Sequence, residues 1–176
     1  MSEPYVEVVS ETDLQRRVIQ LGAEIADDYR TTVPIVVGVL KGSVPFLADL
    51  VRAMDSTVQV DFLSLTRFGE EGRVSIAMDV SVPLRGRDVL IVEDIVDTGL
   101  TLTALQRMLM LREPNSLQTV TLLDKAPRRI VDIDLAYRGF EVGDEFLLGY
   151  GLDWNGRYRN LRSLWAVMDL ATFADD

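Results

Sequence analysis

Cysteine and histidine are both absent from the 176 residues of this chain. Without cysteine the chain can form no disulfide and has no thiol nucleophile. Without histidine it lacks the commonest transition-metal ligand and the side chain that most often acts as a general base. Proton transfer and metal binding must therefore depend on carboxylates, and Mg²⁺ is the ion that best suits such oxygen ligands.

Long apolar runs and a basic excess are also missing. No run approaches the roughly 20 residues that a membrane-spanning helix needs, and the first residues lack the basic and apolar regions of a signal peptide. The 18 basic and 28 acidic residues give a net charge of −10, which argues against binding to nucleic acid or to an anionic membrane. We therefore expect a cytoplasmic protein with neither of these partners.

The length and the pattern of apolar segments predict one domain, residues 1–176, of the α/β class with a parallel sheet. Residues 10–13 resemble a capping box, with Asp in place of Glu, that opens a helix reaching about residue 29; a second helix is expected over residues 44–54. The two chain ends are expected to form a smaller cap above the sheet. Strands are predicted over residues 34–40, 58–65, 74–80, 89–92, 117–123, 134–137, 146–148 and 164–168, and a polar loop over 68–73.

The most informative stretch runs from Val89 to Thr101. Residues 89–92 are apolar and do not alternate with polar ones, which is typical of a strand buried on both faces of a parallel sheet. Two adjacent carboxylates, Glu93 and Asp94, follow at once, and Asp97 comes next. Ligands bind at the carboxyl ends of such strands, so this is where we expect a functional site.

A short turn, Thr98-Gly99-Leu100-Thr101, follows the carboxylates and leads into a helix. Backbone N–H groups at a helix N-terminus, together with the helix dipole, favour an anion such as phosphate. Gly99 permits a left-handed backbone, and Thr98 or Thr101 can cap the helix or bind phosphate oxygens. The helix itself is predicted from apolar residues at helical spacing, namely Leu100, Ala104, Leu105, Met108 and Leu109.

Glu93 and Asp94 would repel each other and resist burial, so they need hydroxyl donors or a cation. A ribose diol with bound Mg²⁺ supplies both, and Asp97 is placed to act as a base or to oppose positive charge on a substrate. Each residue alone fits an ordinary strand–turn–helix with two exposed acids; the whole string favours a site. The other common phosphate-binding patterns, Gly-x-x-x-x-Gly-Lys-Ser/Thr and Gly-x-Gly-x-x-Gly, do not occur.

The stretch resembles the ribose-phosphate motif of the type I phosphoribosyltransferases. The resemblance implies a Rossmann-like parallel-sheet core with a small hood formed by the chain ends. It also implies that Glu93 and Asp94 hold the ribose hydroxyls, directly or through Mg²⁺. The residues that would bind the ribose and its 5-phosphate are then Glu93, Asp94, Asp97, Thr98, Gly99, Leu100 and Thr101.

Two further segments resemble those of the hypoxanthine-guanine phosphoribosyltransferases. Leu40-Lys41-Gly42 resembles their pyrophosphate loop, which implies that Lys41 and Gly42 bind pyrophosphate and that the Leu40–Lys41 peptide bond is cis. Taken alone, the segment reads as a solvated lysine in a turn. Residues 122–125 end in Lys125, which the resemblance assigns to the 6-oxo group of a purine; alone, they lead into a basic turn.

The block from residue 144 to residue 159 completes the resemblance. It implies that Phe146 stacks on the purine ring and that the backbone of Leu147 contacts the edge of the base. Asp153 would bind a second Mg²⁺ ion, and Arg159 would bind pyrophosphate. Phe146 alone is more typical of a core aromatic.

The resemblance as a whole implies that hypoxanthine and guanine react with 5-phosphoribosyl 1-diphosphate to give IMP or GMP and pyrophosphate. Asp97 would accept the proton of the purine, and the protein would be a homodimer or homotetramer. One segment departs from the family: residues 66–73 lack its Ser-Tyr pair and are a few residues short. How the site is shielded from water is therefore open, and Arg67 or Arg73 is a candidate to contact pyrophosphate instead.

Three alternatives stay open at this point. The acceptor can be xanthine, guanine alone or a pyrimidine; Lys125 and Phe146 favour a 6-oxopurine but do not separate hypoxanthine from guanine. A nucleotide-sensing RNA-binding regulator on the same fold is a second alternative, although the acidic composition speaks against it. A purely structural role would leave the acidic strand end unexplained.

Overall fold

Six strands form the central sheet of the computed structural model, which describes residues 5–68 and 73–168. Their spatial order is β4-β3-β2-β5-β6-β7. All neighbours are parallel except β3 and β4, which form an antiparallel edge. The predicted parallel α/β sheet is thus confirmed, with one antiparallel edge strand that was not expected. The strands are β2 (Ile35–Leu40), β3 (Gln59–Phe68), β4 (Arg73–Met78), β5 (Asp88–Val96), β6 (Ser116–Asp124) and β7 (Tyr137–Glu141).

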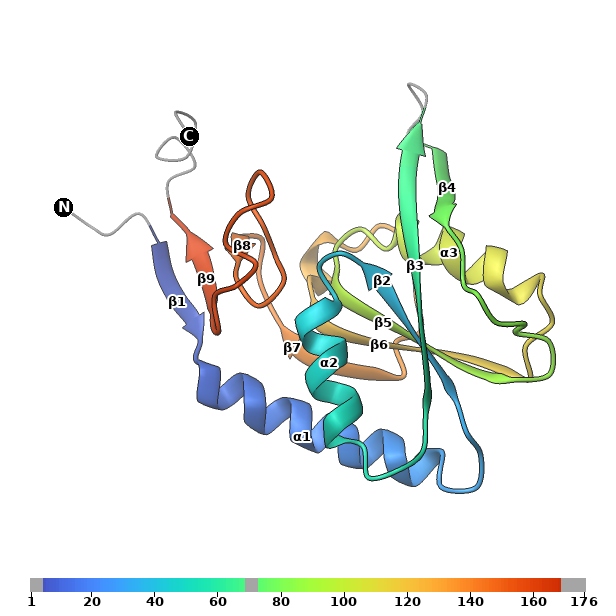
Figure 1. Cartoon of the computed structure of the whole chain (residues 1–176). Helices are drawn as coiled ribbons and strands as arrows, with labels where there is room; N and C mark the ends of the chain where they lie inside the picture. Colours follow the sequence, from blue (N-terminus) through green and yellow to red (C-terminus); the bar gives the residue numbers. More distant parts are fainter. Residues whose placement is uncertain (1–4, 69–72, 169–176) are drawn as a thin grey trace.

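A separate three-stranded antiparallel sheet, which we call the hood sheet, has the order β1-β9-β8. It joins β1 (Tyr5–Val9) to β9 (Leu164–Val167), so strands from opposite ends of the sequence lie side by side (Figure 1). Its third strand is β8 (Phe146–Leu148). The predicted cap is confirmed, and β8 adds a segment that leads out of the central sheet.

Helices cover both faces of the central sheet. α1 (Glu11–Asp28) and α2 (Val44–Ala53) pack together on one face, whereas α3 (Leu100–Met110) packs on the other. The N-cap of α1 is Ser10, whose Oγ accepts a hydrogen bond from the Asp13 backbone N–H at 3.2 Å, which confirms the expected helix start. None of the described helices has the length and apolar character needed to cross a membrane.

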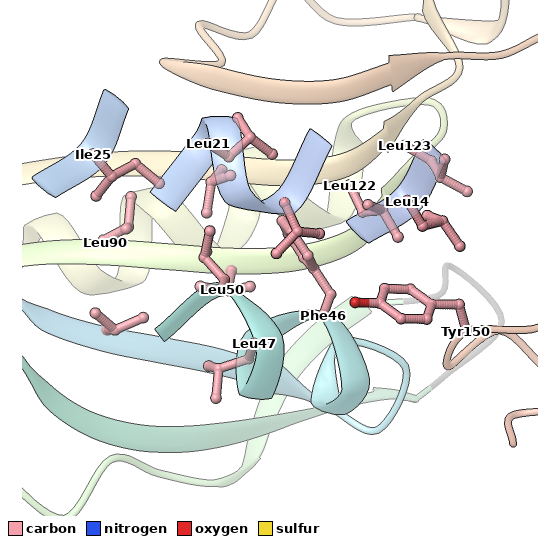
Figure 2. Close-up of a cluster of buried hydrophobic side chains, with 14 of the residues drawn as sticks. Leu14, Leu21, Ile25, Phe46, Leu47, Leu50, Leu90, Leu122, Leu123 and Tyr150 are labelled. Atoms are coloured by element: carbon pink, nitrogen blue, oxygen red, sulfur yellow. The ribbon is translucent and has the colours of Figure 1, made fainter. Parts of the chain in front are cut away.

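The larger core lies between α1, α2 and the sheet. Figure 2 shows Leu14 and Leu21 of α1 facing Phe46 and Leu50 of α2, with Leu122 of β6 beside them. All five side chains are fully buried, and each such burial contributes about 1.5–3 kcal/mol. The apolar stripe predicted for the first helix therefore forms the contact that holds this helix layer on the sheet.

Several boundaries differ from the sequence predictions. β3 continues to Phe68 and β4 begins at Arg73, so both ends of the predicted polar loop at 68–73 belong to strands. The strand expected at residues 134–137 is found at Tyr137–Glu141, where its pairing with β6 begins at Tyr137 opposite Val120. Gly139 lies so close to the Leu122 carbonyl that no Cβ would fit. Gly139 and the preceding Arg138 interrupt the apolar pattern from which this strand could have been predicted.

β5 does not stop at the carboxylates. It continues to Val96, because β6 is equally long and pairs with it at Ile95 and Val96. Glu93 and Asp94 therefore lie within the last part of a strand rather than after it. The apolar stripe of α3 was also shifted: the buried residues are Leu102, Leu105 and Leu109, while Leu100 is 51% exposed at the first position of the helix.

Candidate active site

A cavity of about 470 Å³ opens at the carboxyl ends of β2 and β5. It brings together residues that were predicted from three separate segments of the sequence. The loop after β2, the end of β5 with the turn that follows, and the loop between β8 and β9 each contribute. The predicted site residues that line the cavity are Lys41, Gly42, Glu93, Asp94, Asp97, Thr98, Gly99, Thr101, Asp153 and Arg159.

Glu93 and Asp94 are carboxylates that have lost most of their water. Burial, with the charge of Asp94 in second place, raises the pKa of Glu93 well above 4.5, and its carboxylate accepts no hydrogen bond within the described residues. Burial also raises the pKa of Asp94, against a hydrogen bond from the Ile95 N–H at 2.8 Å. Such desolvated acids are stabilised in the charged form by a cation or a hydroxyl donor.

The loop after β2 approaches Asp94 closely. The Leu40–Lys41 peptide bond is cis, as the resemblance implied. Gly42 lies against the Asp94 carboxylate, and its own carbonyl lies against Gly151, which has a φ of +105°. Lys41 is exposed, and its ammonium makes no hydrogen bond or ion pair with the described part of the chain.

Asp153 and Arg159 face the cavity but bind each other. Arg159 Nη2 lies 2.7 Å from Asp153 Oδ1, and Arg159 Nη1 donates to the Gly151 carbonyl at 2.6 Å. Asp153 Oδ2 accepts a hydrogen bond from the Gly156 N–H at 2.8 Å. In this structure the predicted metal ligand and the predicted pyrophosphate arginine are therefore an ion pair.

The acidic residues do not form a closed metal cage. Among residues 5–68 and 73–168, no three acidic side chains are grouped as a metal site would require. Mg²⁺ usually keeps several waters and takes only one or two carboxylates together with substrate phosphates. Glu93 and Asp94, desolvated at the cavity wall, fit an ion bound in that way.

The turn before α3 has the geometry of an anion site. Gly99 is the N-cap of the helix with a φ of +85°, and no side chain caps the helix. Because Gly99 holds the N-cap position, the predicted capping role of Thr98 or Thr101 is wrong. Thr98 Oγ1 accepts a long 3.4 Å hydrogen bond from the Leu100 N–H, and the alternative role, binding phosphate oxygens, stays a prediction. The N–H groups of a first helical turn have no partner within the helix. The first turn of α3 lies at the cavity, because Gly99 and Thr101 line it.

Asp97 is bound by an arginine that the sequence reasoning did not select. Its Oδ1 accepts a hydrogen bond from Arg128 Nε at 2.7 Å, and Arg128 Nη1 donates to Asp144 Oδ1 at 2.6 Å. Arg128 ends the short 3₁₀ helix η1 (Ala126–Arg128). Sequence spacing gives no signal for this contact, because 31 residues separate Arg128 from Asp97.

The predicted purine residues lie outside the cavity lining, as does Leu100. Lys125 is buried, and its Nζ donates to the Glu145 carbonyl at 2.7 Å. Phe146 packs edge-to-face on Trp154, with ring centroids 5.3 Å apart. Leu147 pairs with Ala166 in the hood sheet. Arg67 and Arg73 have side chains outside the described set, and residues 69–72 of the departing loop also lie outside it.

Comparison with known proteins agrees with this geometry. The family model described as "Phosphoribosyl transferase domain" matches residues 7–155. A hypoxanthine-guanine phosphoribosyltransferase of Bacillus subtilis (strain 168) is 44% identical over 158 residues, which cover 88% of each chain. The protein of the same name from Aquifex aeolicus (strain VF5) is 44% identical over 167 residues, or 92% of this chain and 94% of the relative.

Solved structures show the same likeness. A hypoxanthine-guanine phosphoribosyltransferase from Bacillus anthracis superposes with a TM-score of 0.89 at 40% identity, covering 92% of this chain and 98% of that one. A hypoxanthine phosphoribosyltransferase from Staphylococcus aureus gives a TM-score of 0.90 at 38% identity, covering 96% and 94%. The family predicted from four segments of the sequence is confirmed: the chain belongs to the phosphoribosyltransferases.

Proposed function

We propose that this phosphoribosyltransferase converts hypoxanthine and guanine, with 5-phosphoribosyl 1-diphosphate, to IMP and GMP and releases pyrophosphate. The observation that carries the proposal is the cavity itself. A pair of desolvated carboxylates, Glu93 and Asp94, adjoins an uncapped helix N-terminus at Gly99. Acids suited to a ribose diol thus lie next to N–H groups suited to its phosphate. The names of the relatives support the same substrates.

The sugar phosphate would bind at the end of β5. Glu93 and Asp94 would hold the two ribose hydroxyls, directly or through Mg²⁺. The 5-phosphate would accept hydrogen bonds from the turn at residues 97–101, where the left-handed Gly99 directs the backbone into α3. The cavity wall formed by the end of β5 and the turn at residues 97–101 would therefore fix the sugar before the reaction.

The pyrophosphate group would lie on the opposite wall. Lys41 and Gly42 follow β2, and Arg159 reaches the same cavity from the loop between β8 and β9. Arg159 would exchange part of its contact with Asp153 for the pyrophosphate, and Asp153 would then be available to a metal ion. When bound, Mg²⁺ supplies positive charge that offsets the charge of the leaving diphosphate.

The purine would lie between Lys125, Phe146 and Leu147. Lys125 would donate to the 6-oxo group, since an ammonium has three N–H donors and only one is used by the Glu145 carbonyl. Phe146 would stack on the ring while Trp154 supports it from the side. Asp97 would accept the proton that the purine imidazole nitrogen loses as the new bond forms.

The chemistry assigned to this chain is mainly positioning and electrostatics. The bond between C1 of the ribose and the diphosphate oxygen breaks, the bond to the purine nitrogen forms, and the proton moves to Asp97. We extend the proposal to a single domain over residues 1–176 and to a cytoplasmic homodimer or homotetramer. The resemblance to the family supports these points, and analytical ultracentrifugation measures the assembly.

The experiment that tests the proposal measures pyrophosphate release from 5-phosphoribosyl 1-diphosphate and Mg²⁺. Hypoxanthine, guanine, xanthine, adenine and uracil are offered separately. We expect turnover with hypoxanthine and guanine but not with adenine, because the Lys125 ammonium favours an oxo group over an amine. Turnover with uracil alone would contradict the proposal, and so would a lack of turnover with all five bases.

A further inference from the structure

Arg128 joins three segments that come together beside the site. Its guanidinium donates to Asp97 Oδ1 at 2.7 Å and to Asp144 Oδ1 at 2.6 Å. Asp97 follows β5 directly, whereas Asp144 lies two residues before Phe146. A single side chain of η1 thus links the end of β5 to the loop before β8, the strand that begins with the proposed purine-stacking Phe146.

Lys125 makes a second contact to the same loop. Its ammonium donates to the Glu145 carbonyl, next to the Asp144 carboxylate that Arg128 holds. The segment from Lys125 to Arg128 is itself fixed to β5, since the Lys125 N–H donates to the Val96 carbonyl at 2.9 Å. Arg128 is therefore placed by the same short segment that carries the proposed reader of the 6-oxo group.

We propose that Arg128 is a positioning residue for the transfer reaction: it fixes the orientation of the Asp97 carboxylate while that carboxylate accepts the proton of the purine. The inference rests on the function proposed above. Arg128 does not touch the substrate in this scheme. It acts through Asp97, with Asp144 holding the other end of its guanidinium.

The geometry of the guanidinium supports this role. Arginine presents five N–H donors in a planar fork, and the fork can bind two carboxylates in fixed directions. Because Nε is directed to Oδ1 of Asp97, the second oxygen, Oδ2, is left for the purine. Both contacts have the length of charge-assisted hydrogen bonds. Hydrogen bonds to Asp144 and Asp97 raise the pKa of Arg128, and the bond to Arg128 lowers the pKa of Asp144.

A role in stability alone does not explain the contact. The side chains of Arg128 and Asp97 are 45% and 43% exposed, and that of Asp144 is 73% exposed. Exposed ion pairs of this kind contribute little to stability. The same contact can have a large effect on rate, because a misplacement of about 1 Å costs on the order of 100-fold.

The test is a double-mutant cycle with Arg128→Ala and Asp97→Asn, measured as kcat and KM for hypoxanthine and 5-phosphoribosyl 1-diphosphate. We expect Asp97→Asn to lower kcat by about 100-fold, at the lower limit for loss of a general base. Arg128→Ala should lower kcat by about 10-fold, as a partial loss of that alignment, and leave the KM for 5-phosphoribosyl 1-diphosphate within about twofold. In the double variant, kcat should equal that of Asp97→Asn, because Arg128 then has no base to orient.

Two results would overturn the inference: an unchanged kcat in Arg128→Ala, or losses that multiply in the double variant. Arg30→Ala is the matched control, since Arg30, in the turn after α1, forms an exposed ion pair with Asp27 of that helix at 3.2 Å. Thermal unfolding of each variant detects a structural effect, and Arg128→Gln repeats the cycle if the alanine variant is unfolded. Normal turnover in Asp97→Asn counts instead against the proton acceptor, and an inactive parent protein counts against the proposed function.

Discussion

The Asp94 carboxylate occupies the position that a side chain at residue 42 would need. Gly42 follows β2, and Asp94 lies near the end of the neighbouring strand β5. The two strands are parallel neighbours, so their carboxyl ends bring the loop and the acid together. Glycine at position 42 is therefore required by the contact itself and by no special backbone angle.

Gly42→Ala should abolish most activity. A Cβ would displace either Asp94 or the loop that carries Lys41, so we expect kcat/KM for 5-phosphoribosyl 1-diphosphate to fall by about 100-fold or more. Gly86→Ala is the control: nothing lies within 4 Å of its added Cβ, although its φ of +68° adds strain. That variant should lose about 1–2 kcal/mol of stability and keep its activity. Steady-state kinetics on both variants checks this. An equal loss of activity in the two variants would contradict the steric argument.

The two lysines of the chain, Lys41 and Lys125, should respond differently to the same substitution. Lys125→Gln should reduce kcat/KM for hypoxanthine by about 10- to 100-fold, the value of a hydrogen bond from a charged group, with little effect on the KM for 5-phosphoribosyl 1-diphosphate. Lys41→Gln should show the reverse pattern. Each variant serves as the control for the other. If both raise the same KM, one of the two assignments is wrong.

Asp124 should matter for stability far more than other ion-paired acids. It is 2% exposed at the end of β6, where it pairs with Arg129 and lies 3.5 Å from Arg138. Asp124→Asn leaves these arginines without a charged partner, and we expect a loss of about 3 kcal/mol in the free energy of unfolding. Asp79→Asn, which removes an exposed partner of Arg112, should cost less than about 1 kcal/mol. Urea denaturation of both variants measures the difference, and equal losses would refute it.

Glu93 should make the metal-free protein less stable as the pH rises. Burial raises its pKa in the folded protein well above 4.5, its ordinary value. The stability that a raised carboxyl pKa provides is complete below pH 4.5 and is lost as the pH rises through the folded-state pKa. The free energy of unfolding, measured in a chelator between about pH 4.5 and 8, should therefore decline, and Glu93→Gln should flatten that decline.

Acid should destabilise the protein through a different set of groups. The pKa values of Asp79 and Asp88 lie below 3.8, mainly because of hydrogen bonds from Arg112 and from Ser116. Their contribution to the free energy of unfolding is present above pH 3.8 and is lost as the pH falls.

The outcome above pH 4.5 tests Glu93 alone. An unchanged pH dependence of stability in Glu93→Gln would mean that groups other than Glu93 cause the decline.

Much of the site could be predicted from the sequence because its residues follow strand ends. Parallel strands bring their carboxyl ends to one edge, so Lys41 and Asp94 line the same cavity although 53 positions separate them along the numbering. The end of β5 could not be predicted, since apolar residues continue beyond Glu93. The buried face of α3 could not be predicted either, since apolar residues lie on both faces of the helix. Arg128 was missed for another reason: its partner Asp97 lies on a segment that only the fold brings close.

The pairing of β1 with β9 has a consequence for synthesis on the ribosome. Strand β1 appears within the first ten residues, but its partner Leu164–Val167 is translated more than 150 residues later, a delay on the order of ten seconds. All strands of the central sheet are complete by Glu141. A nascent chain can thus pair the strands of its central sheet before the partner of β1 has been made, and it gains Asp153 and Arg159, the last residues of the cavity, only after that sheet is complete.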